Sequence, residues 1–280
     1  MNYFETLKYG SSKLRINKII SHSLDSEVLL ANVLDSTRED ILLNLNNKIK
    51  RSKFIKFKKF IFRRKKNEPI AQIINKKEFW KYNFFVNEHV LIPRPETELI
   101  VEEILNLTDI NTSKRILDVG TGSGCIAISI FKERPKCYFT ALDISKNALK
   151  VAKYNAKMHH LGNKIKFVNI DIDKFLDNKY DFIVSNPPYI KKFNLKRLED
   201  NVKFFEPCIA LDAGVDGYKE IKKLILKSKK LLKNNGKLIF EIGKNQEMTS
   251  KNLLVKNGFY INNICKDINT IPRVIVATKI

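Results

Sequence analysis

Residues 117–125 read LDVGTGSGC. The apolar residues before it predict a β-strand over 114–119, and residues 125–134 predict a helix that ends at Pro135. Three glycines at alternate positions let the backbone approach a ligand closely, and the start of a helix offers free N–H groups. The stretch therefore predicts a ligand-binding turn between a strand and a helix.

Strands and helices alternate from residue 114 to the end of the chain. Apolar runs predict strands at 138–142, 165–168, 180–184 and 238–241, and two final strands through 261 and 274–277. Between them, helices are predicted from a cap at Ser145 to Gly162, over 218–232 and over 247–256. This order is typical of an α/β fold with a doubly wound, mostly parallel sheet and helices on both faces.

A smaller helical domain is expected over residues 1–75, with apolar-periodic segments at 23–34, 37–45 and 53–66. Two short β-prone runs then predict a hairpin linker over 76–92, and the α/β domain is expected to span 93–280. Segment 53–66 is basic and amphipathic. It can meet a partner or a membrane surface, or pack on its own domain with solvated lysines, and the second interpretation is favoured.

The chain has 280 residues and a formal net charge of +22, from 52 basic and 30 acidic side chains. This charge favours polyanionic partners, such as non-specific contact with nucleic acid or the ribosome. Only 10 residues are glycine, while lysine, asparagine and isoleucine abound, as an A+T-rich gene would impose. Functional charge and compositional bias therefore both stay open as explanations.

The four cysteines, Cys125, Cys137, Cys208 and Cys265, lie far apart and form no CxxC pair. This spacing argues against a disulfide framework and a zinc site, and no metal is expected. The N-terminus lacks the pattern of a signal peptide, and no apolar run approaches the ~18 residues of a membrane span. A cytoplasmic protein with no membrane contact is expected, and a monomer.

Two acidic positions follow the next strands of the predicted sheet. Asp143 ends a strand just over 20 residues beyond the glycine turn, where a carboxylate can bind both ribose hydroxyls. A helix cap is the alternative, which Ser145 makes less necessary. Asp171 can take an adenine amino group and Ile172 can cover the ring, although Asp173 competes for that role.

Asn186, Pro187, Pro188 and Tyr189 follow the strand at 180–184 directly. A plain loop explains neither both prolines nor the tyrosine. An amide nitrogen is a poor nucleophile, and the Asn186 side-chain oxygen and the Pro187 carbonyl can each accept one of its N–H groups. The prolines fix these acceptors and Tyr189 can stack on a planar group, so the turn predicts methylation of an amide or amino nitrogen without a strong general base.

The glycine turn resembles the S-adenosylmethionine loop of class I methyltransferases. Over residues 68–280 the sequence resembles the HemK/PrmC family, the protein-(glutamine-N5) methyltransferases that act on peptide-chain release factors. The markers are EPIA at 68–71, EFW at 78–80, LIPRPETE at 91–98, NPPYI at 186–190, FEP at 205–207, Leu211, Asp216-Gly217 and Arg273-Val274. The turn at 186–189 is shared with adenine-N6 DNA methyltransferases, whereas the 91–98 segment is far more specific.

The resemblance implies a class I methyltransferase fold with a seven-stranded sheet and S-adenosylmethionine as cofactor. It implies that the cofactor is bound by Gly120, Thr121, Gly122, Ser123, Gly124, Asp143, Asp171, Ile172 and Asn186. It also implies that residues 186–189 hold the glutamine of the release factor's Gly-Gly-Gln tripeptide. Two departures are an isoleucine at position 172, where some relatives carry an aromatic residue, and an altered loop at 212–214.

Three hypotheses follow. A release factor glutamine methyltransferase is favoured, and an adenine-N6 methyltransferase acting on DNA or RNA is the alternative, weakened because no target-recognition domain is evident. A basic binding module with a vestigial fold is the third, and the intact glycine turn, Asp143 and Asn186 argue against it.

Overall fold

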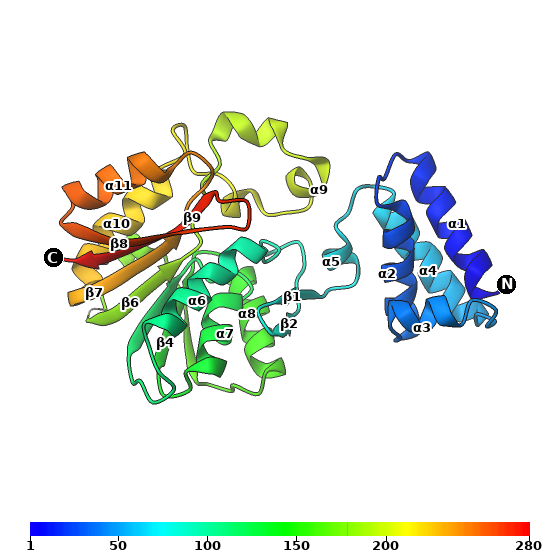
Figure 1. Cartoon of the computed structure of the whole chain (residues 1–280), viewed down its shortest axis with the longest axis horizontal. Helices are drawn as coiled ribbons and strands as arrows, with labels where there is room; N and C mark the ends of the chain where they lie inside the picture. The colour runs from blue at the N-terminus through cyan, green and yellow to red at the C-terminus, as the bar shows by residue number, and fades with distance from the viewer. Residues whose placement is uncertain (178) are drawn as a thin grey trace. The chain divides into compact units, whose positions relative to one another are not determined.

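The computed structural model describes residues 1–177 and 179–280, which divide into two compact units (Figure 1). The first comprises residues 1–76 and 199–205, and the second comprises 77–198 and 206–280. The hairpin that the sequence predicts as a linker belongs to the second unit, because Phe79 and Phe84 are buried in its core. Residues 199–205 join the first unit, where the Gln72 side-chain amide donates to the Phe205 carbonyl at 2.7 Å.

The first unit is helical. It contains α1 (Tyr3–Ile16), α2 (His22–Leu34), α3 (Arg38–Leu43), α4 (Arg51–Arg64) and α5 (Ile70–Ile73). Thr37 caps α3 as its position predicts, since its side chain accepts from the Asp40 N–H at 3.1 Å. The basic helix α4 buries Phe57 and Ile61 in the core of this unit and leaves Lys56, Lys58 and Lys59 exposed.

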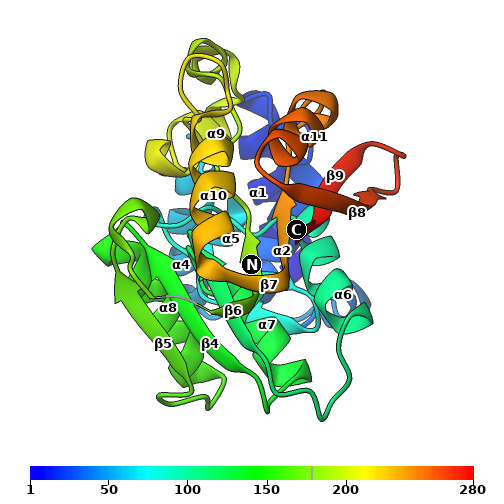
Figure 2. The ribbon, with the colours of Figure 1, turned by 90° about the vertical axis from the view of Figure 1, so that its left-hand side faces the viewer.

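The second unit is built on a seven-stranded sheet with the order β5-β4-β3-β6-β7-β9-β8. Its strands are β3 (Arg115–Val119), β4 (Tyr138–Asp143), β5 (Ile165–Asn169), β6 (Tyr180–Ser185), β7 (Leu232–Glu241), β8 (Phe259–Lys266) and β9 (Pro272–Lys279). The first five in this order are parallel, and β9 runs antiparallel to β7 and β8. Figure 2 shows β5 and β8 at opposite ends of the sheet. The mostly parallel strands, which alternate with helices along the chain, confirm the predicted α/β class.

Helices cover both faces of the sheet, because successive side chains of a strand point to opposite faces. One core packs Ile116 under α6 (Glu98–Asn106), α7 (Cys125–Glu133) and α8 (Lys146–Met158). The other packs the next residue, Leu117, under α10 (Lys219–Leu231) and α11 (Glu247–Lys256). Helix α8 ends at Met158 and does not reach Gly162 as expected, because the chain turns at His160 with a φ of 60°.

The short elements lie outside the sheet. The hairpin strands are β1 (Lys77–Phe79) and β2 (Tyr82–Phe84), and the remaining pieces are η1 (Pro95–Thr97), η2 (Ile172–Lys174), η3 (Lys192–Arg197), α9 (Asp200–Lys203) and η4 (Cys208–Ala210). Among the helices of residues 1–177 and 179–280, none has the length and apolar character to cross a membrane. The same residues contain no cluster of metal-binding side chains.

The strand order places the two predicted motifs together. The chain moves outward from β3 to β4 and β5, then returns to β6 beside β3 and continues to β7. In open α/β sheets, ligands bind at the carboxyl ends of the strands where this direction reverses. The glycine turn follows β3 and Asn186 follows β6, so both lie at the reversal point.

Candidate active site

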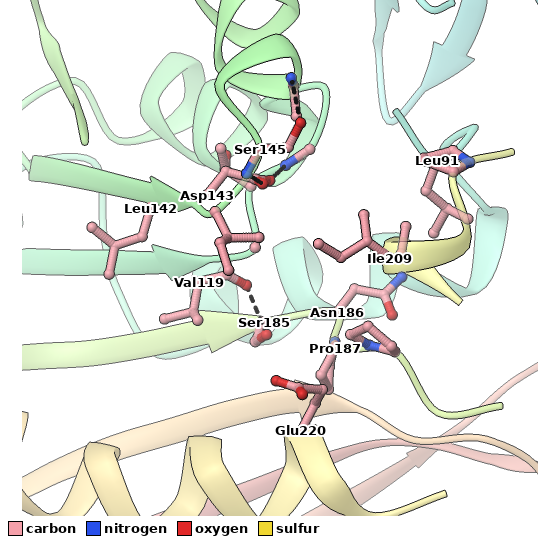
Figure 3. A pocket seen from close by; sticks show the side chains of 18 of the residues that line it. Leu91, Val119, Leu142, Asp143, Ser145, Ser185, Asn186, Pro187, Ile209 and Glu220 are labelled. Carbon is pink, nitrogen blue, oxygen red and sulfur yellow. Dashed lines mark hydrogen bonds between the residues drawn. The ribbon is translucent and has the colours of Figure 1, made fainter. Parts of the chain in front are cut away.

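A cavity of about 580 Å³ lies at the carboxyl ends of β3, β4 and β6 (Figure 3). This volume falls within the range of about 300–1,000 Å³ that is usual for small-molecule sites. The wall includes most of the residues that the sequence singles out: Gly120, Thr121, Gly122, Ser123, Asp143, Asp171, Ile172, Asn186, Pro187 and Pro188. Gly124 and Tyr189 contribute differently, as described below.

Gly120 and Gly124 are needed in the turn for different structural reasons. Gly120 has a φ of +73°, and a Cβ placed on it would meet no atom within 4 Å, so the space in front of it is open for a ligand. At Gly124 a Cβ would lie 3.0 Å from Ile128 Cδ1 and 3.2 Å from Ala152 Cβ. Gly120 therefore leaves room in the cavity, whereas Gly124 allows the start of α7 to pack closely against α8.

Asp118 holds the turn from inside the protein. Its Oδ2 accepts a hydrogen bond of 2.6 Å from the Thr121 hydroxyl, and its side chain is fully buried. Burial raises the pKa of Asp118 to about 7. Asp118 is not among the site residues that the sequence predicts, although it is the one acidic residue of β3.

Asp143 connects the glycine turn to the start of α8. Its Oδ2 accepts from the Gly122 N–H at 2.9 Å, and its Oδ1 accepts from the Ser145 N–H at 2.8 Å. Burial raises the pKa of this carboxyl, and the two backbone hydrogen bonds oppose that shift. Each oxygen keeps a further lone pair for a ligand hydroxyl, so a structural and a ligand-binding task are compatible here.

Asp171 is already engaged by protein groups. Lys223 Nζ lies 3.1 Å from its Oδ2, and its Oδ1 accepts from the Asp173 N–H at 2.9 Å as the cap of η2. Ile172 is buried on the cavity wall next to it. Asp173 thus contributes a backbone donor to the turn. A ligand group that binds the Asp171 carboxylate would do so beside the bond from Lys223.

Asn186 is the central polar side chain of the second motif. The residue before it is locked to β3, because the Ser185 hydroxyl donates to the Val119 carbonyl at 2.8 Å (Figure 3). The Asn186 Nδ2 donates to Thr97 Oγ1 at 2.9 Å, and the Thr97 hydroxyl donates to Glu241 Oε2 at 2.5 Å. Within the described part of the chain, Asn186 Oδ1 accepts no hydrogen bond from the protein.

Tyr189 turns toward Glu241. Its hydroxyl donates a hydrogen bond to the Glu241 carboxyl. Burial raises the pKa of the Tyr189 phenol, and the negative charge of Glu241 raises it further. Its ring lies against Gly243, where an added Cβ would come within 2.9 Å of Tyr189 Cδ2. The Tyr189 carbonyl accepts from the Gln246 side chain at 3.2 Å. These contacts fix the turn in place. The stacking of Tyr189 on a planar target group stays a prediction.

The altered loop at 212–214 supports the same turn. The Ile190 N–H donates to the Leu211 carbonyl at 3.2 Å, and the Ala213 N–H donates to the Ile190 carbonyl at 2.9 Å. Asp212 Oδ1 accepts from the Gly214 N–H at 2.8 Å and closes the loop. The Asp-Ala-Gly sequence therefore forms a hydrogen-bonded support for the residues after the prolines.

The 91–98 segment contacts several other segments of the second unit. Arg94 forms a 2.5 Å ion pair with Glu206, whose side chain is 1% exposed. Glu98 accepts from the Trp80 N–H at 2.8 Å. With Thr97, these contacts involve three of the four charged or hydroxyl residues of the segment, and they reach the markers at 78–80 and 205–207. Neither Thr97 nor Glu241 is among the site residues that the sequence predicts, although an acid at the end of the apolar strand 238–241 is a usable signal.

The cavity fits S-adenosylmethionine by the chemistry of its wall. Gly120 leaves open space beside the start of a helix, which suits a charged, compact group. Asp143 offers acceptors for sugar hydroxyls, and Leu142 and Ile172 offer apolar contact for a ring. Asn186 presents a free amide oxygen at the same cavity.

Two family models match this chain. The family described as "PrmC N-terminal domain" matches residues 5–74, and "Methyltransferase small domain" matches residues 95–202. The structure of a methyltransferase from Pyrococcus furiosus aligns with a TM-score of 0.53 at 18% identity, over 70% of this chain and 88% of that chain. This likeness shows the fold, which is that of a class I methyltransferase.

Curated relatives match nearly the whole chain. The bifunctional methyltransferase of Rickettsia felis is 35% identical over 99% of this chain, and the match spans 58% of that relative's own length. The release factor glutamine methyltransferase of Clostridium acetobutylicum is 37% identical over 91% of this chain and 90% of that protein. The one of Buchnera aphidicola subsp. Baizongia pistaciae is 36% identical over 98% of both. The chain therefore belongs to the release factor glutamine methyltransferase family.

Proposed function

We propose that this protein transfers a methyl group from S-adenosylmethionine to the side-chain amide nitrogen (N5) of the glutamine in the Gly-Gly-Gln tripeptide of peptide-chain release factors. One observation carries the proposal. Asn186 is anchored through its NH₂ group to Thr97, which leaves its Oδ1 as a free, fixed acceptor at the cavity. An acceptor oxygen is what the binding of a target NH₂ group requires.

The residues of the turn act by holding the target nitrogen. Asn186 Oδ1 accepts one N–H of the glutamine amide and the Pro187 carbonyl accepts the other, so the nitrogen is fixed as it loses conjugation with its carbonyl. S-adenosylmethionine, when bound, supplies a methyl group made electrophilic by a positively charged sulfur. Such positioning contributes roughly 7–11 kcal/mol in well-oriented two-substrate reactions. Water takes the proton, which is acidic once the nitrogen is alkylated.

The same acceptors discriminate glutamine from glutamate. A glutamate carboxylate has no N–H group and would face two oxygens that it cannot bond. Sites built to bond a particular donor reject analogues without it by roughly 10⁴-fold.

We assign the cofactor to the turn over 120–124, with Asp143 on the ribose hydroxyls, Asp171 and Ile172 at the adenine, and Asn186 beside the methyl group. The open space at Gly120 and the acceptors of Asp143 support this placement. The helical domain over 1–75 would bind the release factor, and the α/β domain over 93–280 would carry the chemistry.

The remaining proposals concern the setting of the enzyme. We propose a cytoplasmic monomer, and the four free cysteines support the cytoplasmic location. Its net charge of +22 would add non-specific affinity for nucleic acid or the ribosome. Methylation of adenine N6 is not favoured, because the match over residues 5–74 is to the PrmC N-terminal domain.

Incubation with a release factor and methyl-labelled cofactor tests the proposal. Label is expected on the tripeptide glutamine by mass spectrometry, and none on a release factor in which that glutamine is replaced by glutamate. Asn186→Ala is expected to abolish transfer while changing cofactor affinity by less than about tenfold, since one hydrogen bond is lost. Label on the glutamate-bearing release factor, or on genomic DNA alone, would contradict the proposal.

A further inference from the structure

A buried chain of hydrogen bonds ends at the amide that holds the target. Asn186 Nδ2 donates to Thr97 Oγ1 at 2.9 Å, and Thr97 Oγ1 donates to Glu241 Oε2 at 2.5 Å. Thr97 is 2% exposed and Glu241 is 1% exposed, so water does not compete for these bonds. The three residues come from η1, the end of β6 and the end of β7. The fold therefore brings together three side chains that are far apart in the sequence.

The direction of these bonds follows from a count of protons. An ionised carboxylate can only accept, so the single hydroxyl proton of Thr97 must point to Glu241. The Thr97 oxygen is then left as an acceptor and binds the NH₂ group of Asn186. The Asn186 oxygen must therefore face the cavity.

We infer that Thr97 and Glu241 are positioning residues, and that ionised Glu241, acting through the Thr97 hydroxyl, turns the Asn186 amide oxygen toward the target nitrogen. The inference rests on the proposed function for the identity of the target. Neither residue needs to touch the substrate. Both act through Asn186.

The charge state of Glu241 is finely balanced. Burial raises its pKa to about 7, against the hydrogen bonds from Thr97 and Tyr189. Glu96 on η1 raises this pKa further, and Arg273 on β9 lowers it, although Arg273 also pairs with Asp267 at 2.8 Å. These are the titratable groups that act on Glu241 from the elements packed around it. Both protonation states are therefore populated near neutral pH.

Protonation of Glu241 reverses the direction of these hydrogen bonds. A neutral Glu241 can donate to Thr97, which frees the Thr97 proton to point at Asn186. The amide then turns its oxygen to Thr97 and presents its NH₂ group to the cavity, where it cannot accept from a target NH₂. Transfer should therefore be lost as the pH falls through the pKa of Glu241 and recovered as the pH rises. A reaction without a general base would otherwise lack this dependence.

Enzyme kinetics with a release factor separate this role from a structural one. We expect the wild-type kcat to rise between about pH 6 and about pH 9 with an apparent pKa near 7. Thr97→Val, which keeps the shape and removes the hydroxyl, should lower kcat about 10–100-fold and abolish the rise, because misplacement of a reacting group has effects of that size. Thr97→Ser should restore both. Glu241→Gln should abolish the rise.

A general base at Glu241 predicts a different result. Its ionisation would still control the rate in Thr97→Val, so the rise with pH would persist in that variant. Persistence of the rise, or a wild-type kcat in Thr97→Val, overturns the inference. Calorimetric cofactor binding within about twofold of wild type, and an unchanged circular dichroism spectrum, show that the variant is folded.

An NMR measurement tests the inference without turnover. The side-chain amide resonances of Asn186, identified by their loss in Asn186→Ala, should shift in the free protein with a midpoint near pH 7. The shift should be absent in Thr97→Val and in Glu241→Gln. A shift that survives in both variants, or no shift in the wild type, contradicts the inference. If instead the wild type shows the shift but does not methylate the release factor, the proposed function fails and the positioning network stands.

Discussion

Replacement of Gly120 by alanine separates the cost of backbone strain from the cost of filling the cofactor site. Gly120 and Gly162 both have positive φ, +73° and +53°, and at neither would a Cβ meet an atom within 4 Å. Both are exposed to solvent. Gly120 lines the cavity and Gly162 does not, so Gly162→Ala is a matched control.

The stability cost should be the same in both variants. An alanine in the left-handed region costs about 1–2 kcal/mol, and the lower entropy of the unfolded chain offsets roughly 0.4–1 kcal/mol of it. A net loss of up to about 1.6 kcal/mol in the free energy of unfolding follows for each. Urea denaturation followed by circular dichroism measures this quantity in the two variants.

Cofactor binding should differ sharply between them. A methyl group on residue 120 occupies open space at the turn and holds a ligand away from the backbone N–H groups. Loss of about two such hydrogen bonds, at roughly 1 kcal/mol each, corresponds to a 10–100-fold weaker affinity. Calorimetric titration with S-adenosylmethionine should show this loss in Gly120→Ala and none in Gly162→Ala. Equal affinities for the two variants would refute the placement of the cofactor at the turn.

Three stability predictions concern the residues that support the site and the helical unit, each measured by denaturant unfolding. Gly10→Ala should destabilise α1 by about 1–3 kcal/mol despite alanine's better helix propensity, because the new Cβ would lie 2.4 Å from Ser26 Oγ. Asn155→Ala should cost at least about 1–3 kcal/mol, since it breaks two hydrogen bonds to the partly buried backbone of Phe85 and one to the buried Ser123 carbonyl. Arg94→Ala should cost about 1–3 kcal/mol by leaving Glu206 buried without its partner, a value discounted for the partial exposure of Arg94. No measurable loss in any of these variants contradicts the contact concerned.

Most of the sheet could be predicted because its strands are short apolar runs bounded by glycine, proline or a capping residue. Strands β3 to β6 and helices α7, α10 and α11 all lie within about two residues of their predicted limits. Helix α1 was not predicted, because Gly10 and the serines after it are weak helix formers. It forms because Gly10 lets the helix pack closely on α2 and α4. Tertiary packing of this kind is not visible as local periodicity.

The segment from 190 to 216 could not be predicted for a different reason. Its short helices have no apolar periodicity, and its shape depends on backbone hydrogen bonds such as those between Ile190, Leu211 and Ala213. Site residues within one motif could be read from the sequence, since each motif follows a strand end. Contacts between motifs could not. Thr97 lies 89 residues from Asn186 and 144 residues from Glu241.

Under the proposed function, the contacts of Thr97 bear on how glutamine would be selected. An asparagine side chain has an oxygen and an NH₂ group of nearly equal size, and nothing in Asn186 itself decides which one faces the target. The decision comes from the Thr97 proton, and that proton is directed by Glu241. An aspartate at position 186 would present acceptors on both sides, but it would compete with Glu241 for one proton and place two carboxylates around one hydroxyl. The amide is therefore the side chain that satisfies both Thr97 and a target NH₂ group. In the proposed reaction the 91–98 segment would take part in the recognition of glutamine, although only its hydroxyl reaches Asn186.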